Sequence, residues 1–312
     1  MKSYSNKVIW AAGLAGLLSI GAGTIFGQNT QSPPAQQQQP QQQQPQQEQQ
    51  PQQQQPNNNA PAQGNGQGSN TTGLTLDTAP PPASAEEDSA YKAFDAVPAT
   101  DSQKKIAAGE DFLQKYPESR YRPPVYSALT IAYLQTGQAQ KAFDVGDKEV
   151  QLKPDDVQTL AILSQTIPRA MNANSPEAQQ QLDKAENYGK RAIDIVPTMT
   201  KPANLPDDKF EMAKNQTLSM AHGGVGLVYL RRGKFDEAIP ELEQSIKLDP
   251  NPTADPVNYY LLGIANEKTS HFDAAVAAFT KCGEISGSLQ QTCKSGAAEA
   301  KKQGSSQLSA PN

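Results

Sequence analysis

Apolar and small residues recur three and four positions apart in the stretch 219–250, the spacing that places them on one face of an α-helix. The inward positions of its two halves are Val225, Gly226, Tyr229, Phe235, Ala238, Ile239, Leu242 and Ile246. Gly233 divides the halves, and Pro250 ends the second, because a proline disfavours helical dihedrals in the residue before it. The stretch therefore predicts two antiparallel helices that cross at the small residues Gly226 and Ala238.

This stretch resembles the tetratricopeptide repeat (TPR), a helical hairpin with a period of about 34 residues. The resemblance rests on the order of small residue, Tyr, Gly turn, aromatic residue, Ala, large apolar residue and final Pro. The repeat-defining structural residues along the chain are Tyr133, Gly137, Ala142, Gly226, Tyr229, Ala238, Leu242, Pro250, Gly263, Phe272, Ala275 and Phe279. One departure is His222, where the family often has an aromatic residue. The resemblance implies an all-α solenoid of TPR hairpins.

The solenoid is expected to span residues 83–303. It would comprise a divergent hairpin at 84–117, repeats at about 123–156, 156–198, 219–252 and 256–289, and a capping helix at 290–302. A polar terminal helix of this kind covers the last apolar face of a solenoid. Residues 304–312 are expected to form a disordered tail. The segment FLQKYPESRY, which ends at Tyr121, also resembles the junction of bacterial envelope TPR proteins of the Tol-Pal-associated and outer-membrane-assembly types.

Several positions depart from the repeat pattern. Gly146 stands where a large apolar residue is usual, which predicts looser packing of the 123–156 hairpin. Pro168 should kink its helix or end it early, because proline lacks the amide hydrogen that a helix uses. Asp207 should cap a long helix that runs on into the 219–252 repeat. Asn266 replaces the expected Tyr in the last repeat.

The N-terminal region predicts export. Lys2 and Lys7 precede an apolar run at 8–26, so residues 1–27 fit either a cleaved signal peptide or a retained transmembrane anchor. Either interpretation places the remainder in the periplasm or cell envelope. Residues 28–82 are rich in Gln, Pro and Asn, which predicts a disordered linker. This linker is either a tether for the repeats or a low-complexity insertion without a specific role.

Composition bears on the expected partners and chemistry. The formal net charge of the 312-residue chain is −5, without a long basic run, so nucleic acid is not an expected partner. Membrane contact is expected only through the N-terminal segment, if that segment is not cleaved. The two histidines, His222 and His271, lie in no catalytic or metal-binding motif. We therefore expect no enzyme activity, cofactor or metal.

The two cysteines, Cys282 and Cys293, flank a Gly-rich bend. In an antiparallel hairpin they would lie at similar distances from the turn, and an exported protein favours a disulfide between them. The alternatives are two buried thiols or a metal site, although two cysteines without a nearby histidine are a poor set of zinc ligands.

The resemblance to TPR arrays also implies a concave groove lined by the first helix of each hairpin. The candidate groove residues are Ile131, Leu134, Leu227, Arg231, Tyr260, Ile264 and Lys268. They are mostly apolar, which argues against capture of a C-terminal carboxylate and favours an extended or helical peptide with apolar anchors. Alternatively, some of them pack against a neighbouring helix.

The expected function is a non-catalytic TPR scaffold that mediates protein–protein interaction in the bacterial cell envelope. One alternative is a component of envelope maintenance, similar to Tol-Pal or outer-membrane-assembly TPR proteins. An alternative of another class is an accessory to, or part of, an envelope enzyme.

Overall fold

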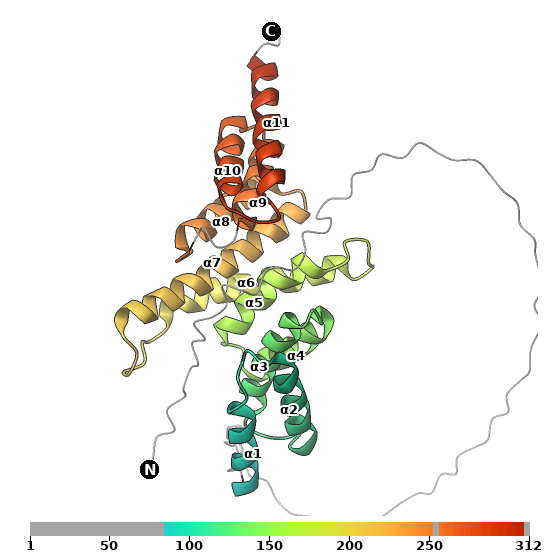
Figure 1. Ribbon diagram of the computed structural model, residues 1–312, viewed down its shortest axis with the longest axis vertical. Coiled ribbons are helices and arrows are strands. Elements are labelled where there is room, and N and C mark those ends of the chain that lie inside the picture. The colour runs from blue at the N-terminus through green and yellow to red at the C-terminus, as the bar shows by residue number, and fades with distance from the viewer. Residues whose placement is uncertain (1–83, 252–255, 309–312) are drawn as a thin grey trace, which may run out of the picture. The chain divides into compact units, whose positions relative to one another are not determined.

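The computed structural model describes residues 84–251 and 256–308, which form eleven α-helices and one 3₁₀ helix (Figure 1). The helices are α1 (Ala85–Asp95), α2 (Ser102–Lys115), α3 (Arg122–Gln135), α4 (Ala139–Leu152), α5 (Val157–Ala170), α6 (Ala178–Ile195), η2 (Val196–Thr198), α7 (Asp207–Arg231), α8 (Phe235–Leu248), α9 (Val257–Lys268), α10 (Phe272–Glu284) and α11 (Gln290–Leu308). The predicted all-α fold class is confirmed. The predicted signal or anchor at 1–27 and the linker at 28–82 lie outside the described residues.

Successive helices pack as hairpins: α1 with α2, α3 with α4, α5 with α6, α7 with α8, and α9 with α10, while α11 packs on α10. Gly137 and Gly233 each turn a hairpin with a φ of 73°, a left-handed conformation that glycine adopts without strain. Ser270 takes the corresponding place between α9 and α10, with a φ of 61°. Within the described ranges, no helix combines the length and apolar character needed to cross a membrane.

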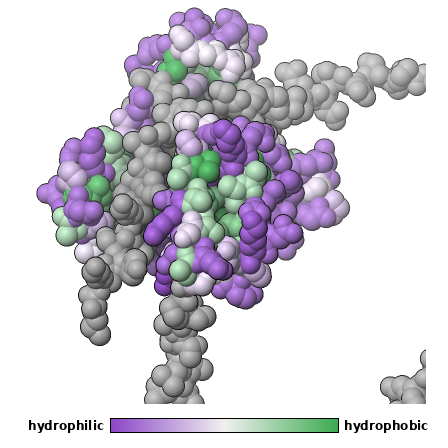
Figure 2. Space-filling view, turned by 60° about the horizontal axis from the view of Figure 1, so that its bottom comes forward, coloured by the Kyte–Doolittle hydropathy of each residue, from purple (hydrophilic) through white to green (hydrophobic). Residues whose placement is uncertain are grey.

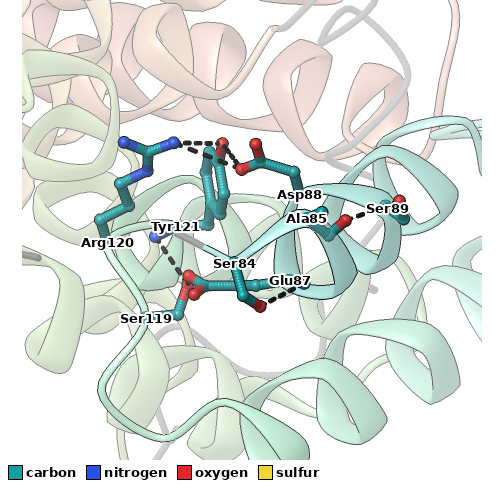
Figure 3. Close-up of polar contacts among 8 residues, drawn as sticks. All are labelled: Ser84, Ala85, Glu87, Asp88, Ser89, Ser119, Arg120 and Tyr121. Atoms are coloured by element: carbon teal, nitrogen blue, oxygen red, sulfur yellow. Dashed lines mark hydrogen bonds and ion pairs between the residues drawn. The ribbon is translucent and has the colours of Figure 1, made fainter. Parts of the chain in front are cut away.

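Residues 116–121 (YPESRY) connect α2 to α3, and their side chains contact α1. In Figure 3, Arg120 and the hydroxyl of Tyr121 both point toward Asp88 of α1. The Tyr121 hydroxyl donates to the Asp88 carboxylate at 2.6 Å, and the Arg120 guanidinium lies 3.3 Å from the same oxygen. Ser119 donates to Glu87 at 2.5 Å. Hydrogen bonds from Tyr121 and Arg120 lower the pKa of the Asp88 carboxyl. Three consecutive residues of the junction therefore hold the first hairpin in place.

Helix α7 is 25 residues long and packs against α5, α6, α8 and α9. Its glycines allow these close approaches. A Cβ on Gly224 would lie 2.4 Å from Ser164 Oγ of α5, and one on Gly226 would lie 2.8 Å from Leu242 Cγ of α8. Such contacts leave no room for a side chain at either position. The predicted close crossing at Gly226 agrees with this geometry.

Two residues that depart from the repeat pattern are accommodated in the structure. The space beside Gly146 is filled from the next hairpin, because a Cβ on residue 146 would lie 2.9 Å from Cδ2 of Leu163 in α5. Pro168 does not shorten α5, which has 14 residues, as α3 does. This proline lies in the last turn, where few helical hydrogen bonds follow it.

Two helix ends also differ from expectation. Pro206, not Asp207, is the N-cap of α7, and its carbonyl accepts from the Phe210 amide at 3.0 Å. The Asp207 carboxylate instead pairs with Lys201 at 2.8 Å. At the other end, α11 continues through Leu308, into the range expected to be a disordered tail. This helix remains packed on α10 beyond residue 302, since a Cβ on Gly304 would lie 3.1 Å from Phe272 Cβ.

The C-terminal helix is joined covalently to the preceding hairpin. Cys282 of α10 and Cys293 of α11 are bonded as a disulfide, with their Cα atoms 5.7 Å apart. Both cysteines are fully buried and pack with Leu289. Val257, Tyr259 and Tyr260 of α9 cover this small cluster.

Candidate binding surface on the first helices

The first helices of the hairpins carry the candidate groove residues. Of these helices, α5 contacts α7, and α7 contacts α9. The side chains of Leu134, Leu227 and Ile264 are buried, with exposed fractions of 8%, 1% and 8%. They belong to the hydrophobic cores. These three residues therefore pack against neighbouring helices, the alternative given for the candidate groove, and they are not available to a partner.

The other candidates are accessible. Ile131, Arg231 and Tyr260 are half-buried, and Lys268 is exposed. We call these four residues the first-helix surface. It combines an aliphatic side chain, an aromatic ring and two cations, a mixture typical of the centre and rim of protein interfaces.

Arg231, in the last turn of α7, differs from its neighbour Arg232. The Arg232 guanidinium pairs with Asp183 at 2.5 Å and with Glu186, both of α6. Arg231 has no hydrogen bond or ion pair with any residue in the described part of the chain, and its buried Nε lacks a partner. Burial lowers the pKa of its guanidinium. Arg232 therefore stabilises the packing of α7 on α6, whereas Arg231 carries an unmatched charge.

Tyr260 is held in position by the core beneath it. Its ring centroid lies 6.0 Å from that of Phe279 in α10, and the ring also covers the disulfide cluster. Burial raises the pKa of its hydroxyl. A ring fixed on one side in this way offers a partner a contact that costs little side-chain entropy.

Buried polar pairs connect successive hairpins, and the sequence analysis missed them. The Thr159 hydroxyl of α5 donates to Glu149 of α4, and Asn258 of α9 donates to the Ser245 hydroxyl of α8 at 2.8 Å. Each pair joins a second helix to the first helix of the next hairpin. These buried pairs serve packing between hairpins.

Each of the two histidines contacts a polar side chain of the described chain. His222 Nδ1 lies 2.7 Å from a Glu241 carboxylate oxygen, which joins α7 to α8. His271 is exposed at the N-cap of α10, with Nδ1 3.0 Å from the Thr269 hydroxyl. No group of three or more metal-ligating side chains occurs among residues 84–251 and 256–308.

Most of the face drawn in Figure 2 is hydrophilic, and apolar side chains gather there in patches bordered by polar ones. Within the described chain, the exposed large apolar side chains are Leu152 and Met212, at 44% and 47%. Apolar contacts for a partner are therefore local and surrounded by polar groups.

Residues 219–252 match the family model of the tetratricopeptide repeat. No curated protein matches the chain. Among solved structures, the chain is similar to the MamA RS-1 ArsTM double mutant, with 15% identity over 65% of this chain and 95% of that chain, and a TM-score of 0.46. It is also similar to TTC0263, a thermophilic TPR protein in Thermus thermophilus, with 19% identity over 69% of this chain and 99% of that chain, and a TM-score of 0.43. The family match assigns one tetratricopeptide repeat to the chain, and this matched repeat comprises the C-terminal half of α7 together with α8.

Proposed function

We propose that this protein is a non-catalytic scaffold of the bacterial cell envelope, which binds a protein or peptide partner through its first-helix surface. TPR domains bind such partners. The four residues of the surface supply apolar, aromatic and cationic contacts on helices that the cores hold rigidly. Rigid elements lower the entropy cost of association.

The observation that carries this proposal is the state of Arg231. A half-buried guanidinium without a hydrogen-bond partner in the described chain keeps part of its desolvation cost and gains no compensating attraction. A carboxylate or carbonyl group of a bound partner would provide that attraction. The partner is therefore a peptide segment that places an acidic or backbone oxygen at Arg231 and apolar side chains against Ile131 and Tyr260.

A photoreactive phenylalanine analogue at position 131 or 260 tests the surface in cells. The full-length protein should cross-link to a partner from these positions, and the same analogue at Gln151, on the exposed face of α4, should not. Arg231→Glu should lower the cross-link yield by about tenfold, since a repulsive contact replaces an attractive one. Equal cross-linking from position 151, or a yield unchanged by Arg231→Glu, would contradict the proposed surface.

The envelope location rests on Lys2, Lys7 and the apolar run at 8–26, which lie outside the described residues. Fractionation of the source cells should recover the protein in the periplasm or with the membranes. The intact mass of the recovered chain distinguishes a cleaved signal from a retained anchor. Recovery in the cytoplasmic fraction would overturn the location without affecting the binding surface.

A further inference from the structure

A second candidate surface lies between the last two hairpins. A shallow, open cleft of about 640 Å³ lies between α8 and the turn that joins α9 to α10. Asp236, Ile239 and Glu243 line it from α8, and Asn266 and Ala274 line it from the last hairpin. None of the first-helix surface residues takes part in this lining.

The hairpin turns align Asn266 with two tyrosines. In three hairpins, one backbone carbonyl accepts a hydrogen bond from the amide five residues later in the chain. The accepting carbonyls belong to Tyr133 (2.8 Å), Tyr229 (2.9 Å) and Asn266 (2.8 Å). Because the same turn hydrogen bond forms in each, these residues occupy equivalent places. The last repeat therefore has a short carboxamide where the others have a large ring.

The α3–α4 hairpin shows what fills this place in a complete repeat. The Tyr133 hydroxyl donates to Glu110 of α2, the second helix of the preceding hairpin, at 2.5 Å. The Lys141 ammonium lies 4.0 Å from the same carboxylate and 5.3 Å from the centroid of the Tyr133 ring. A carboxylate, an aromatic ring and an ammonium thus contact one another, an arrangement stabilised by a hydrogen bond and a cation–π contact.

The cleft keeps the carboxylate of this trio and lacks the other two groups. Glu243 precedes Asn266 by 23 residues, as Glu110 precedes Tyr133, and Ala274 follows Asn266 by 8 residues, as Lys141 follows Tyr133. Glu243, Asn266 and Ala274 all line the cleft. The ring and the ammonium that would occupy this space are therefore the groups absent from the last hairpin.

The remaining lining favours a cation beside an apolar group. Asn266 is 4% exposed, and its Nδ2 donates to the Leu262 carbonyl at 2.9 Å. The charged side chains of the lining include Asp236, Glu243 and Asp273, and no Lys or Arg lines the cleft. Half-buried Ile239 and Phe272 supply apolar surface beside these acids.

We propose that this cleft is a docking site for a partner peptide that carries an aromatic side chain next to a Lys or Arg. The aromatic ring would take the place that Tyr133 fills in its own hairpin, and the cation would take the place of Lys141, beside Glu243. The described acids around the cleft form no group of three or more metal-ligating side chains. Their negative charges would instead attract the Lys or Arg side chain of the peptide. This site is additional to the first-helix surface, and none of the four residues of that surface lines it.

A phage-displayed library of twelve-residue peptides, selected against the full-length protein, tests the proposal. Selected peptides should be enriched in an aromatic residue within two positions of Lys or Arg. In fluorescence anisotropy, a selected peptide should bind at least tenfold more weakly to Glu243→Lys. The matched control is Glu237→Lys, an exposed charge reversal on the same helix outside the cleft, which should bind as the unchanged protein does.

A second variant fills the cleft with the chain's own groups. Asn266→Tyr combined with Ala274→Lys rebuilds the trio of the α3–α4 hairpin, so it should abolish peptide binding while the melting temperature stays the same or rises. Thermal unfolding followed by circular dichroism checks that all variants fold. Arg231→Glu should leave this binding unchanged, so failure of the first-helix surface and failure of the cleft can be told apart.

Three results with peptides would overturn the proposal. They are a selection without enrichment above background, enriched peptides without the aromatic–basic pairing, and peptides that bind the filled variant as tightly as the unchanged protein. Self-association in light scattering that disappears in the filled variant would show that a second copy occupies the cleft, which also excludes a peptide partner as its occupant.

Discussion

Gly224 of α7 lies directly against the backbone of Ser164 in α5. A Cβ on residue 224 would lie 2.6 Å from the Ser164 carbonyl carbon and 2.7 Å from its carbonyl oxygen. Ser164 is fully buried, and Gly189 of α6 approaches the same hydroxyl. Helices α5, α6 and α7 therefore meet at a point where even a methyl group does not fit.

Gly224→Ala should consequently destabilise the protein by about 1–3 kcal/mol, because overpacking a rigid crossing forces the backbones apart. Alanine has a better intrinsic helix propensity than glycine, so propensity alone predicts the opposite sign. Urea unfolding measures the difference. Lys209→Ala, at an exposed position of the same helix, should change the free energy of unfolding by less than about 0.5 kcal/mol. A stabilised Gly224→Ala variant would contradict the close contact.

Glu149 should make stability depend on pH. Burial, together with the charge of Asp156, raises the pKa of this carboxyl from 4.5 to about 9, so the folded protein holds it protonated at neutral pH. The unfolded chain releases that proton above about 4.5, so the stability conferred by the neutral form is present below that pH and is lost as pH rises toward 9.

The isostere Glu149→Gln cannot ionise and can still accept from Thr159. It should match the unchanged protein near pH 4.5 and become more stable than it at higher pH, by up to about 1.4 kcal/mol per pH unit. Thermal melts from pH 4.5 to 9 measure this gap, and Glu237→Gln, on an exposed side chain, serves as the control. A constant gap across that range would mean that Glu149 is already ionised in the folded state.

Tyr121 should determine how firmly α1 is attached. Its ring stacks on Tyr91 of α1 with centroids 4.0 Å apart, and its hydroxyl donates to Asp88. Tyr121→Ala removes both contacts, so amide exchange in α1 should become faster by about tenfold or more. Tyr121→Phe keeps the stacking and should have a smaller effect. Hydrogen exchange with mass spectrometry should find α9 and α10 unchanged in both variants, and unaltered exchange of α1 would refute this role.

The disulfide should contribute to the stability of the C-terminal helix. Cys282 and Cys293 enclose a loop with a sequence separation of 11. Closing a loop of that size contributes on the order of 2–3 kcal/mol. Replacing both cysteines by Ser should lower the free energy of unfolding accordingly, with the loss concentrated in α11. Reduction of the unchanged protein should reproduce that loss, and if it does not, the serine hydroxyls rather than the missing bond cause the effect.

The periodic positions were predictable because each hairpin repeats the same local physics. Gly137 and Gly233 were predictable because each hairpin requires a turn residue with a left-handed conformation. Tyr133 and Tyr229 were predictable because each precedes such a turn at the same spacing, and its carbonyl accepts the turn hydrogen bond. Asn266 was recognised in the sequence as a missing Tyr. Its consequence was not predictable, because Glu243, which lines the same cleft, belongs to another repeat.

The candidate groove was only partly predictable for a related reason. A helical wheel separates inward from outward positions for a helix buried on one side. Helix α7 packs against α5, α6, α8 and α9, so Leu227 is buried although its wheel position points away from its own hairpin. Spacing along a single repeat carries no information about how many neighbours a helix has.

Helix α7 belongs to both hydrophobic cores. Ala221 and Val228 pack in the core that begins at α1, and Leu227 and Leu230 pack in the core that ends at α11. In a solenoid, the coupling between neighbouring units decides whether regions unfold separately. Melting either core would expose apolar side chains of the same helix on which the other core depends. The two cores should therefore unfold in one cooperative transition, with no partly folded state that divides the array at α7. Both proposed binding surfaces would then be lost in the same transition.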